Sequence, residues 1–158
     1  MQSRSIKEIR DELKNYPPEQ IQDLCLRMAK YKKDNKELLT YLLFESENEA
    51  AFIQAVKDDI DLGFKSMNRK SGYLIKKSLR KILKDTTQAI RYSGIKTTEI
   101  ELLIYFCRMM RTEKIPMQSS LVIRNMYARQ VQKIETTVGK LHEDLQYDFE
   151  DDIAYLKA

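Results

Sequence analysis

The stretch YLIKKSLRKILKDTTQAIRY, residues 73–92, decides the fold predicted for this chain. It contains no proline, it follows a Ser71–Gly72 pair, and Gly94 lies two residues after its end, at a position where helices often end with a positive φ. We therefore predict a helix from Tyr73 to about Tyr92. Its apolar residues recur at intervals of three and four, the spacing that places side chains on one helical face: Ile75, Leu79, Ile82, Leu83 and Ile90.

The same periodicity predicts four helices on the N-terminal side of this stretch. Ser5 and Glu8 have the spacing of a capping box, and Pro17 with Pro18 separates the first helix from the second. Asp34 with Glu37 repeats the capping arrangement before a third helix. The second helix and the fourth, which follows a turn at residues 46–48, are marked by apolar stripes: Ile21, Leu24, Cys25 and Met28, then Phe52, Val56, Ile60 and Phe64.

On the C-terminal side the pattern predicts two more helices. Thr98 and Glu101 are expected to cap a sixth helix that reaches from Glu99 to about Arg111. Pro116 then interrupts the helical pattern. Ser119 or Ser120 caps a last helix whose ten apolar positions are three or four residues apart: Ile123, Tyr127, Val131, Ile134, Val138, Leu141, Leu145, Phe149, Ile153 and Leu156.

These ten positions favour one unbroken helix from residue 120 to residue 157. Nine steps cover the 33 residues from 123 to 156, a mean of about 3.67, close to the period of a straight helix. Such a helix would be about 57 Å long and would overhang a compact domain about 40 Å across. A partner covering the overhang, an elongated domain, or a break at Thr136–Gly139 would resolve this, and the uninterrupted apolar phase favours continuity.

The predicted fold is all-α. It is an array of about seven antiparallel helices, or a short solenoid of helical hairpins, with a long C-terminal helix and a single domain over residues 1–158. Four Gly and three Pro in 158 residues are too few for the frequent turns of a sheet protein. With 42% hydrophobic residues, a chain of this length can bury a core without disulfide or metal.

The sequence predicts a cytoplasmic protein without a membrane span. Residues 1–14 mix charged and apolar residues, unlike a signal peptide, and the apolar run 100–110 is interrupted by Glu101 and Arg108. Cys25 and Cys107 are far apart and form no C-x-x-C pair. Both fall on apolar helical faces, so we expect buried, unbridged thiols in a reducing compartment.

No arrangement of residues indicates catalysis, a metal or a cofactor. His142 is the only histidine, and a surface position explains it better than a ligand role. Neither cysteine has an oriented base nearby in the sequence. Asp144, Asp148 and Asp152 stack at four-residue intervals and offer a divalent cation site as an alternative, but a solvated acidic face is more common. We therefore expect a protein that is not an enzyme.

Residues 65–96 carry the strongest charge signal. They hold ten Lys or Arg against one acid, Asp85, whereas residues 45–64 carry a charge of −5. On a helical projection the basic residues opposite the apolar stripe span an arc of about 140°. We call these six residues the ridge: Lys76, Lys77, Arg80, Lys81, Lys84 and Arg91.

Two interpretations of the ridge remain open. In the favoured one, it packs beside the acidic fourth helix and the charges neutralise each other across a hairpin. In the other, it binds phosphates, because clustered Lys and Arg on one face are typical of nucleic-acid binding. An acidic protein or a membrane surface is a third option.

The function predicted from the sequence is a non-catalytic protein-interaction or adaptor module. Its expected partner is another protein, and a sequence-nonspecific nucleic-acid binder that uses the ridge is the alternative. The overhanging C-terminal helix also offers a surface for a homodimer.

Overall fold

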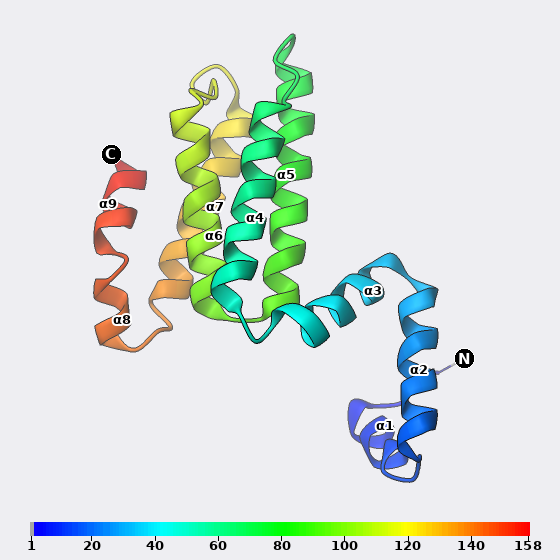
Figure 1. The fold of residues 1–158 in the computed structure, drawn as a ribbon. Coiled ribbons are helices and arrows are strands. Elements are labelled where there is room, and N and C mark those ends of the chain that lie inside the picture. The colour runs from blue at the N-terminus through cyan, green and yellow to red at the C-terminus, as the bar shows by residue number, and fades with distance from the viewer. Residues whose placement is uncertain (1) are drawn as a thin grey trace. The chain divides into compact units, whose positions relative to one another are not determined.

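The computed structural model describes residues 2–158, and within them it contains helices and no strand (Figure 1). The all-α prediction is therefore confirmed. The chain divides into two compact units, an N-terminal unit that ends at Phe44 and a C-terminal unit from Glu45 to Ala158. The prediction of a single domain over residues 1–158 stays a prediction.

The N-terminal unit contains three short helices: α1 (Ile6–Leu13), α2 (Pro18–Tyr31) and α3 (Lys33–Thr40). The predicted capping box is confirmed, because the Ser5 hydroxyl accepts from the Glu8 amide at 3.3 Å and the Glu8 carboxylate accepts from the Ser5 amide at 2.8 Å. Asp34 does not cap α3. The helix begins at Lys33, after an extended Lys32, and no side chain caps it. A π-helical turn, η1 (Tyr41–Glu45), follows α3.

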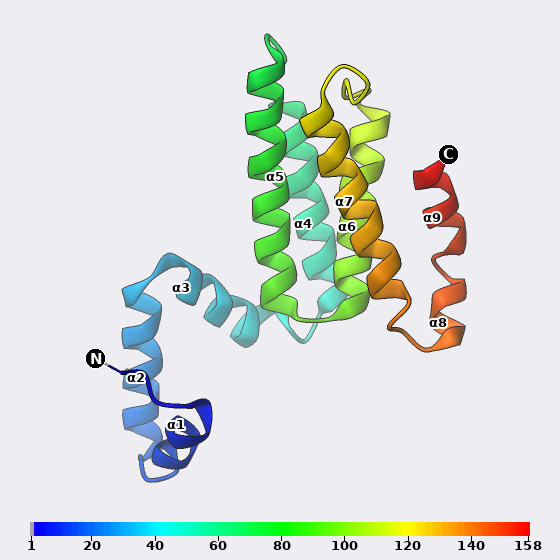
Figure 2. The same cartoon turned by 180° about the vertical axis from the view of Figure 1, so that it is seen from behind.

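The C-terminal unit is built around α6, whose side chains are buried over most of its circumference. Helices α4, α5, α7 and α9 all pack against it (Figures 1 and 2). Among its contacts, the Phe106 ring lies 5.8 Å from that of Phe64 on α4. The helices of this unit are α4 (Glu49–Lys65), α5 (Gly72–Ser93), α6 (Lys96–Thr112), α7 (Leu121–Val138), α8 (Glu143–Tyr147) and α9 (Glu150–Lys157).

Helices α4 and α5 follow their sequence patterns closely. All four residues of the predicted α4 stripe are buried. Helix α5 begins after Ser71, whose hydroxyl accepts from the Leu74 amide at 3.3 Å, and it ends at Gly94 with a φ of +68°. A left-handed residue at this position suits glycine because it has no Cβ to clash with the preceding carbonyl.

Helix α6 begins three residues earlier than predicted, at Lys96, and its first turn has no side-chain cap. Thr98 was expected to cap the helix, but it lies inside the helix and is 1% exposed. Its hydroxyl donates instead to the Glu49 carboxylate of α4. A tertiary hydrogen bond therefore takes the place of the predicted cap.

Apart from Thr98–Glu49, which is 49 residues apart, the polar contacts that join α4 to α6, their C-terminal flanks included, and those that join α6 to α9 share one sequence separation, 44 residues. Because this separation is constant along each pair, α4 and α6 run in the same direction, and so do α6 and α9. The contacts are Lys57–Glu101, Asp61–Tyr105, Arg69–Glu113, Arg108–Asp152 and Arg111 with the Tyr155 carbonyl.

The prediction of an unbroken C-terminal helix was wrong. Helix α7 ends at Val138, Gly139 follows as its C-cap, and His142 begins α8 as its N-cap. The chain then returns beside α6 and α7, where Leu156 becomes 3% exposed and its carbonyl accepts from the Tyr127 hydroxyl at 2.8 Å (Figure 2). Folding back buries apolar side chains that a straight helix would leave in water, and this gain outweighs the helical hydrogen bonds lost at the break.

Candidate functional site

The ridge lies along the side of α5 that faces away from the core. Four residues of the predicted apolar stripe are buried on the opposite side: Ile75, Leu79, Ile82 and Ile90. The fifth, Leu83, is half-buried and lies at the border of the ridge, where it lines a hollow with three of the cations. Lys76 is half-buried and the other five ridge residues are exposed. The amphipathic pattern of residues 73–92 thus fixes which side of α5 the cations occupy.

The ridge cations form no ion pair within the described chain. Within residues 2–158, none of the six side chains forms an ion pair or a hydrogen bond. This includes Lys81 and Asp85, which are four residues apart on the same helix. The cations are therefore left to solvent or to a partner.

The acidic residues of α4 do not neutralise the ridge, because those with tertiary partners bind elsewhere. The Asp61 carboxylate accepts from the Tyr105 hydroxyl of α6 at 2.7 Å, and burial together with this carboxylate raises the pKa of Tyr105 to about 12. The Glu49 carboxylate accepts from Thr98 of α6 and from Ser93 at the end of α5. The pairing expected between the ridge and the fourth helix is therefore not formed.

A shallow hollow of about 300 Å³ lies on the ridge. Three of its lining residues are the ridge cations Arg80, Lys84 and Arg91. Thr87 and Gln88 add neutral hydrogen-bond donors, and Leu83 is its apolar residue. Thr87 and Gln88 were not among the residues predicted for the ridge. The signal was present, because positions 80, 84, 87 and 91 follow a helical stripe of their own.

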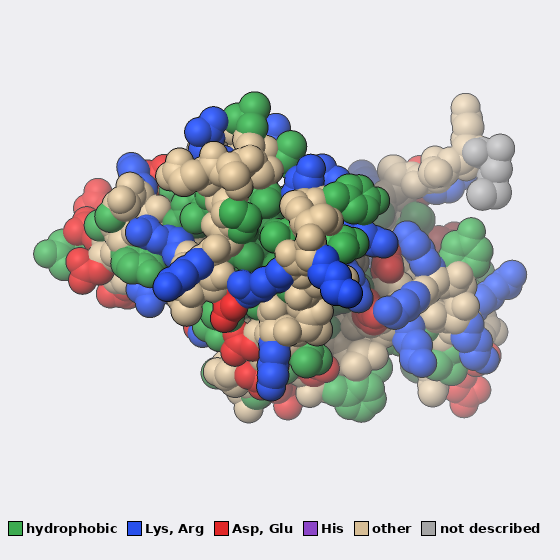
Figure 3. All heavy atoms as spheres, turned by 90° about the horizontal axis from the view of Figure 1, so that it is seen from above, with side chains coloured by type: hydrophobic (Ala, Val, Ile, Leu, Met, Phe, Trp, Pro, Cys, Tyr) green, Lys and Arg blue, Asp and Glu red, His purple; other side chains and the backbone are tan. Residues whose placement is uncertain are grey.

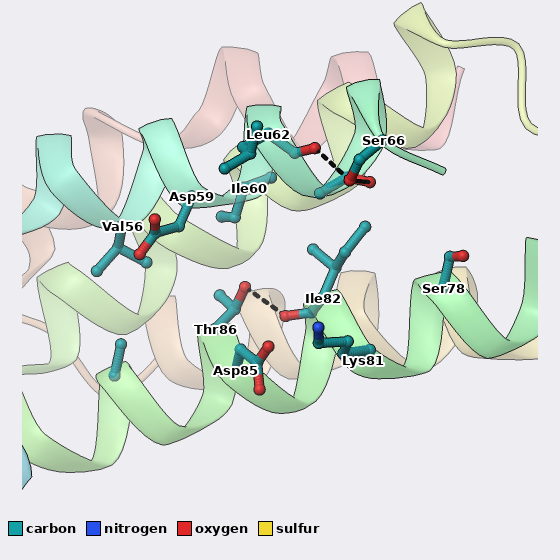
Figure 4. Close-up of a pocket in the computed structure, with 12 residues that line it drawn as sticks. Val56, Asp59, Ile60, Leu62, Ser66, Ser78, Lys81, Ile82, Asp85 and Thr86 are labelled. Carbon is teal, nitrogen blue, oxygen red and sulfur yellow. Dashed lines mark hydrogen bonds between the residues drawn. The ribbon is translucent and has the colours of Figure 1, made fainter. Parts of the chain in front are cut away.

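A second, larger groove of about 520 Å³ lies between α4 and α5 (Figure 4). Its walls carry both signs of charge, with Asp59 from α4 and with Lys81 and Asp85 from α5. The two helices approach closely at Gly63, where a Cβ atom would lie 2.7 Å from Cγ1 of Ile82. The two carboxylates beside Lys81 mark the edge of the purely cationic surface.

Figure 3 looks onto the end of the C-terminal unit where α4 connects to α5 and α6 to α7. Lys and Arg side chains stand out around the helix ends of this face, among apolar and uncharged atoms. Arg69, in the α4–α5 connection, is one cation here with an internal partner, since it bonds to the carboxylate and to the carbonyl of Glu113.

The other candidate residues from the sequence do not come together. The His142 side chain is exposed and caps α8 by accepting from the Asp144 amide at 3.4 Å. Cys107 is buried, and burial raises the pKa of its thiol to about 12, but Cys25 is exposed, contrary to prediction. Asp152 pairs with Arg108. In the part of the chain that the structure describes, no three His, Cys, Asp or Glu side chains could share a metal ion.

Comparisons with known proteins add no family to this picture: no family model, curated protein or solved structure matches the chain. Among residues 2–158, none of the helices has both the length and the apolar content needed to cross a bilayer.

Proposed function

We propose that this chain is a non-catalytic helical interaction module, an adaptor, and that the ridge on α5 is the surface with which it binds an acidic macromolecule. The observation that carries the proposal is that the ridge cations form no internal ion pair in the part of the chain that the structure describes, and that five of the six are exposed. Unpaired charges of one sign, fixed along a regular helix, are suited to a partner of the opposite sign.

The ridge has an energetic cost that a partner would remove. Lys76–Arg80, Lys77–Lys81 and Arg80–Lys84 are like-charge pairs four residues apart. Each pair destabilises a helix by roughly 0.2–0.5 kcal/mol. The single acid of α5, Asp85, forms no ion pair with them. An acidic partner would place negative charges beside these cations, and their attraction to the partner would offset the repulsion among them.

The arrangement of the C-terminal unit supports a binding role. We propose that it is a short stack of antiparallel helical hairpins, α4–α5 and α6–α7, closed by α8 and α9. The constant separation of 44 residues between contacting side chains supports this, because stacked hairpins place their equivalent helices side by side. Such stacks present long, regular surfaces to their partners, and the ridge would be one of them.

A homodimer through the C-terminal helix was expected because an unbroken helix would overhang the domain and need a cover. Instead, α9 packs against α6 and α7 within the same chain, and Lys157 pairs with Glu135 at 2.7 Å.

The test compares two triple variants that lose the same charge. Lys77, Lys81 and Lys84, all changed to Gln, remove ridge charge, while Arg124, Arg129 and Lys140, changed likewise, remove charge from α7 and its C-terminal flank. Lys, Arg and Gln have similar helix propensities, so both variants should fold. On a heparin column we expect the ridge variant to elute at clearly lower salt than wild type and the control variant close to wild type.

The outcome that would overturn the proposal is elution of both variants at the same salt concentration. In that case net charge alone, and not the ridge, would govern polyanion binding. Circular dichroism melts of the three proteins verify that each is folded before the elution is compared.

A further inference from the structure

We infer that the ridge binds the phosphate backbone of double-stranded nucleic acid without reading its sequence. This inference rests on the proposed function, since it names the acidic macromolecule that the ridge receives. Three features of the ridge support it: its length, the lining of its hollow and the absence of aromatic side chains along it.

The length of the ridge matches a regular linear polyanion. From Lys76 to Arg91 the ridge covers 16 residues of unbroken helix, about 22 Å from the first to the last at a rise of 1.5 Å per residue. Each strand of a duplex carries one phosphate per about 3.4 Å of helix axis. Over the length of the ridge one strand therefore presents about six or seven phosphates, close to the number of cations in the ridge.

The hollow within the ridge has the donors that a phosphate group requires. Two guanidinium groups, Arg80 and Arg91, and the Lys84 ammonium line it together with Thr87 and Gln88. Arg can bind a phosphate with two parallel hydrogen bonds, and hydroxyl and amide side chains are frequent phosphate contacts in nucleic-acid complexes. All five of these side chains can donate to an anion.

The same lining disfavours an acidic protein as the ligand. The central parts of protein–protein interfaces are enriched in aromatic and apolar side chains. In this hollow Leu83 is the apolar lining residue, and no aromatic residue lines it. A surface of charged and polar donors is better matched to phosphates, which are bound through charge and hydrogen bonds alone.

The residue types also favour a duplex over a single strand. Proteins that hold single strands combine cations with exposed aromatic rings on which bases stack. Tyr73 is exposed, but it lies at the N-terminal end of α5, and residues 74–91 contain no aromatic residue. A duplex keeps its bases stacked inside and needs no such ring. Three of the four lysines lie outside the hollow and serve as point charges, which hold a backbone without selecting a base.

The experiment measures binding of the full chain to a fluorescently labelled 20-base-pair duplex of arbitrary sequence by anisotropy, between 50 and 200 mM salt. We expect a dissociation constant in the range typical of nonspecific contacts, about 10⁻⁴–10⁻⁶ M. The slope of log K against log salt is negative, and changing Arg80, Lys84 and Arg91 to Gln should make it shallower by about 2–3, because each cation contributes about 0.9 to its magnitude. The control variant of Arg124, Arg129 and Lys140 should keep the wild-type slope.

Two further probes separate this inference from the proposed function. A duplex of unrelated sequence should bind equally well, and a single strand of the same length should bind no more tightly than the duplex. If the chain binds polyglutamate through the ridge but not the duplex, the nucleic-acid inference fails and the acidic-partner proposal stands. If the ridge and control variants change binding to every probe equally, both are overturned.

Discussion

The return of the C-terminal segment onto α6 and α7 can be tested at one buried side chain. Leu156 is 3% exposed, so changing it to Ala removes buried methyl groups and leaves a cavity. Buried Leu→Ala changes cost about 2–5 kcal/mol. Because α9 has only eight residues and can detach locally, we expect a cost in the lower half of this range. An unbroken, overhanging helix would instead leave Leu156 in water, and the change would cost almost nothing.

The measurement is urea unfolding followed by circular dichroism at 222 nm. Tyr147→Ala is the matched control, since this side chain of α8 is 75% exposed and should lose no more than about 0.5 kcal/mol. Asp152→Asn breaks the partly exposed pair with Arg108 and should cost about 0–1 kcal/mol. A Leu156→Ala variant as stable as the Tyr147→Ala variant would refute the packing of α9.

Two further predictions concern packing and a thiol in the C-terminal unit. Gly63→Ala should destabilise the protein by about 1–3 kcal/mol in the same unfolding assay, because the new methyl group meets Ile82 at 2.7 Å. Gly72→Ala, with nothing within 4 Å of its Cβ, should not, and equal stability of the two variants would contradict the close helix approach. Burial raises the pKa of the Cys107 thiol from 9.0 to about 12, so between these two values the unfolded chain loses this proton while the folded protein keeps it. The free energy of unfolding should therefore fall by about 1.4 kcal/mol per pH unit between pH 9 and 12. Cys107→Ala should lack this part of the alkaline loss, and in native protein a maleimide should label the exposed Cys25 and spare Cys107; a variant with an unchanged pH profile would count against the burial argument.

The open ridge changes the balance between the two interpretations that the sequence left. Neutralisation by the fourth helix was favoured because the chain is only mildly basic, with a net charge of +4, and because the sequence contains no nucleic-acid recognition motif. In the structure, Lys57 and Asp61 of α4 face α6, and neither contacts the ridge. This leaves the positive charge of α5 to solvent and to external partners, which is the condition that binding of an acidic macromolecule requires.

Local sequence determined most of the helices of this protein. The stripe of α4, the Ser71 cap and the left-handed Gly94 were all predictable. Helical periodicity and capping depend on residues within about four positions of each other, so a short stretch carries the information. One failure occurred where a distant residue competed. Thr98 lies inside α6, where its hydroxyl donates a hydrogen bond to the Glu49 carboxylate, 49 positions away.

The tertiary structure decided which faces meet and where the last helix ends. The apolar phase from Ile123 to Leu156 is continuous in the sequence, yet the chain breaks after Val138 because packing α9 on α6 and α7 buries Leu156. Likewise, the sequence determined that α5 has a cationic side, but only the packing of α4 against α6 shows that this side is left unpaired. Both outcomes depend on contacts between segments far apart in the chain, whose register is set by the burial of the whole core and not by any single stretch.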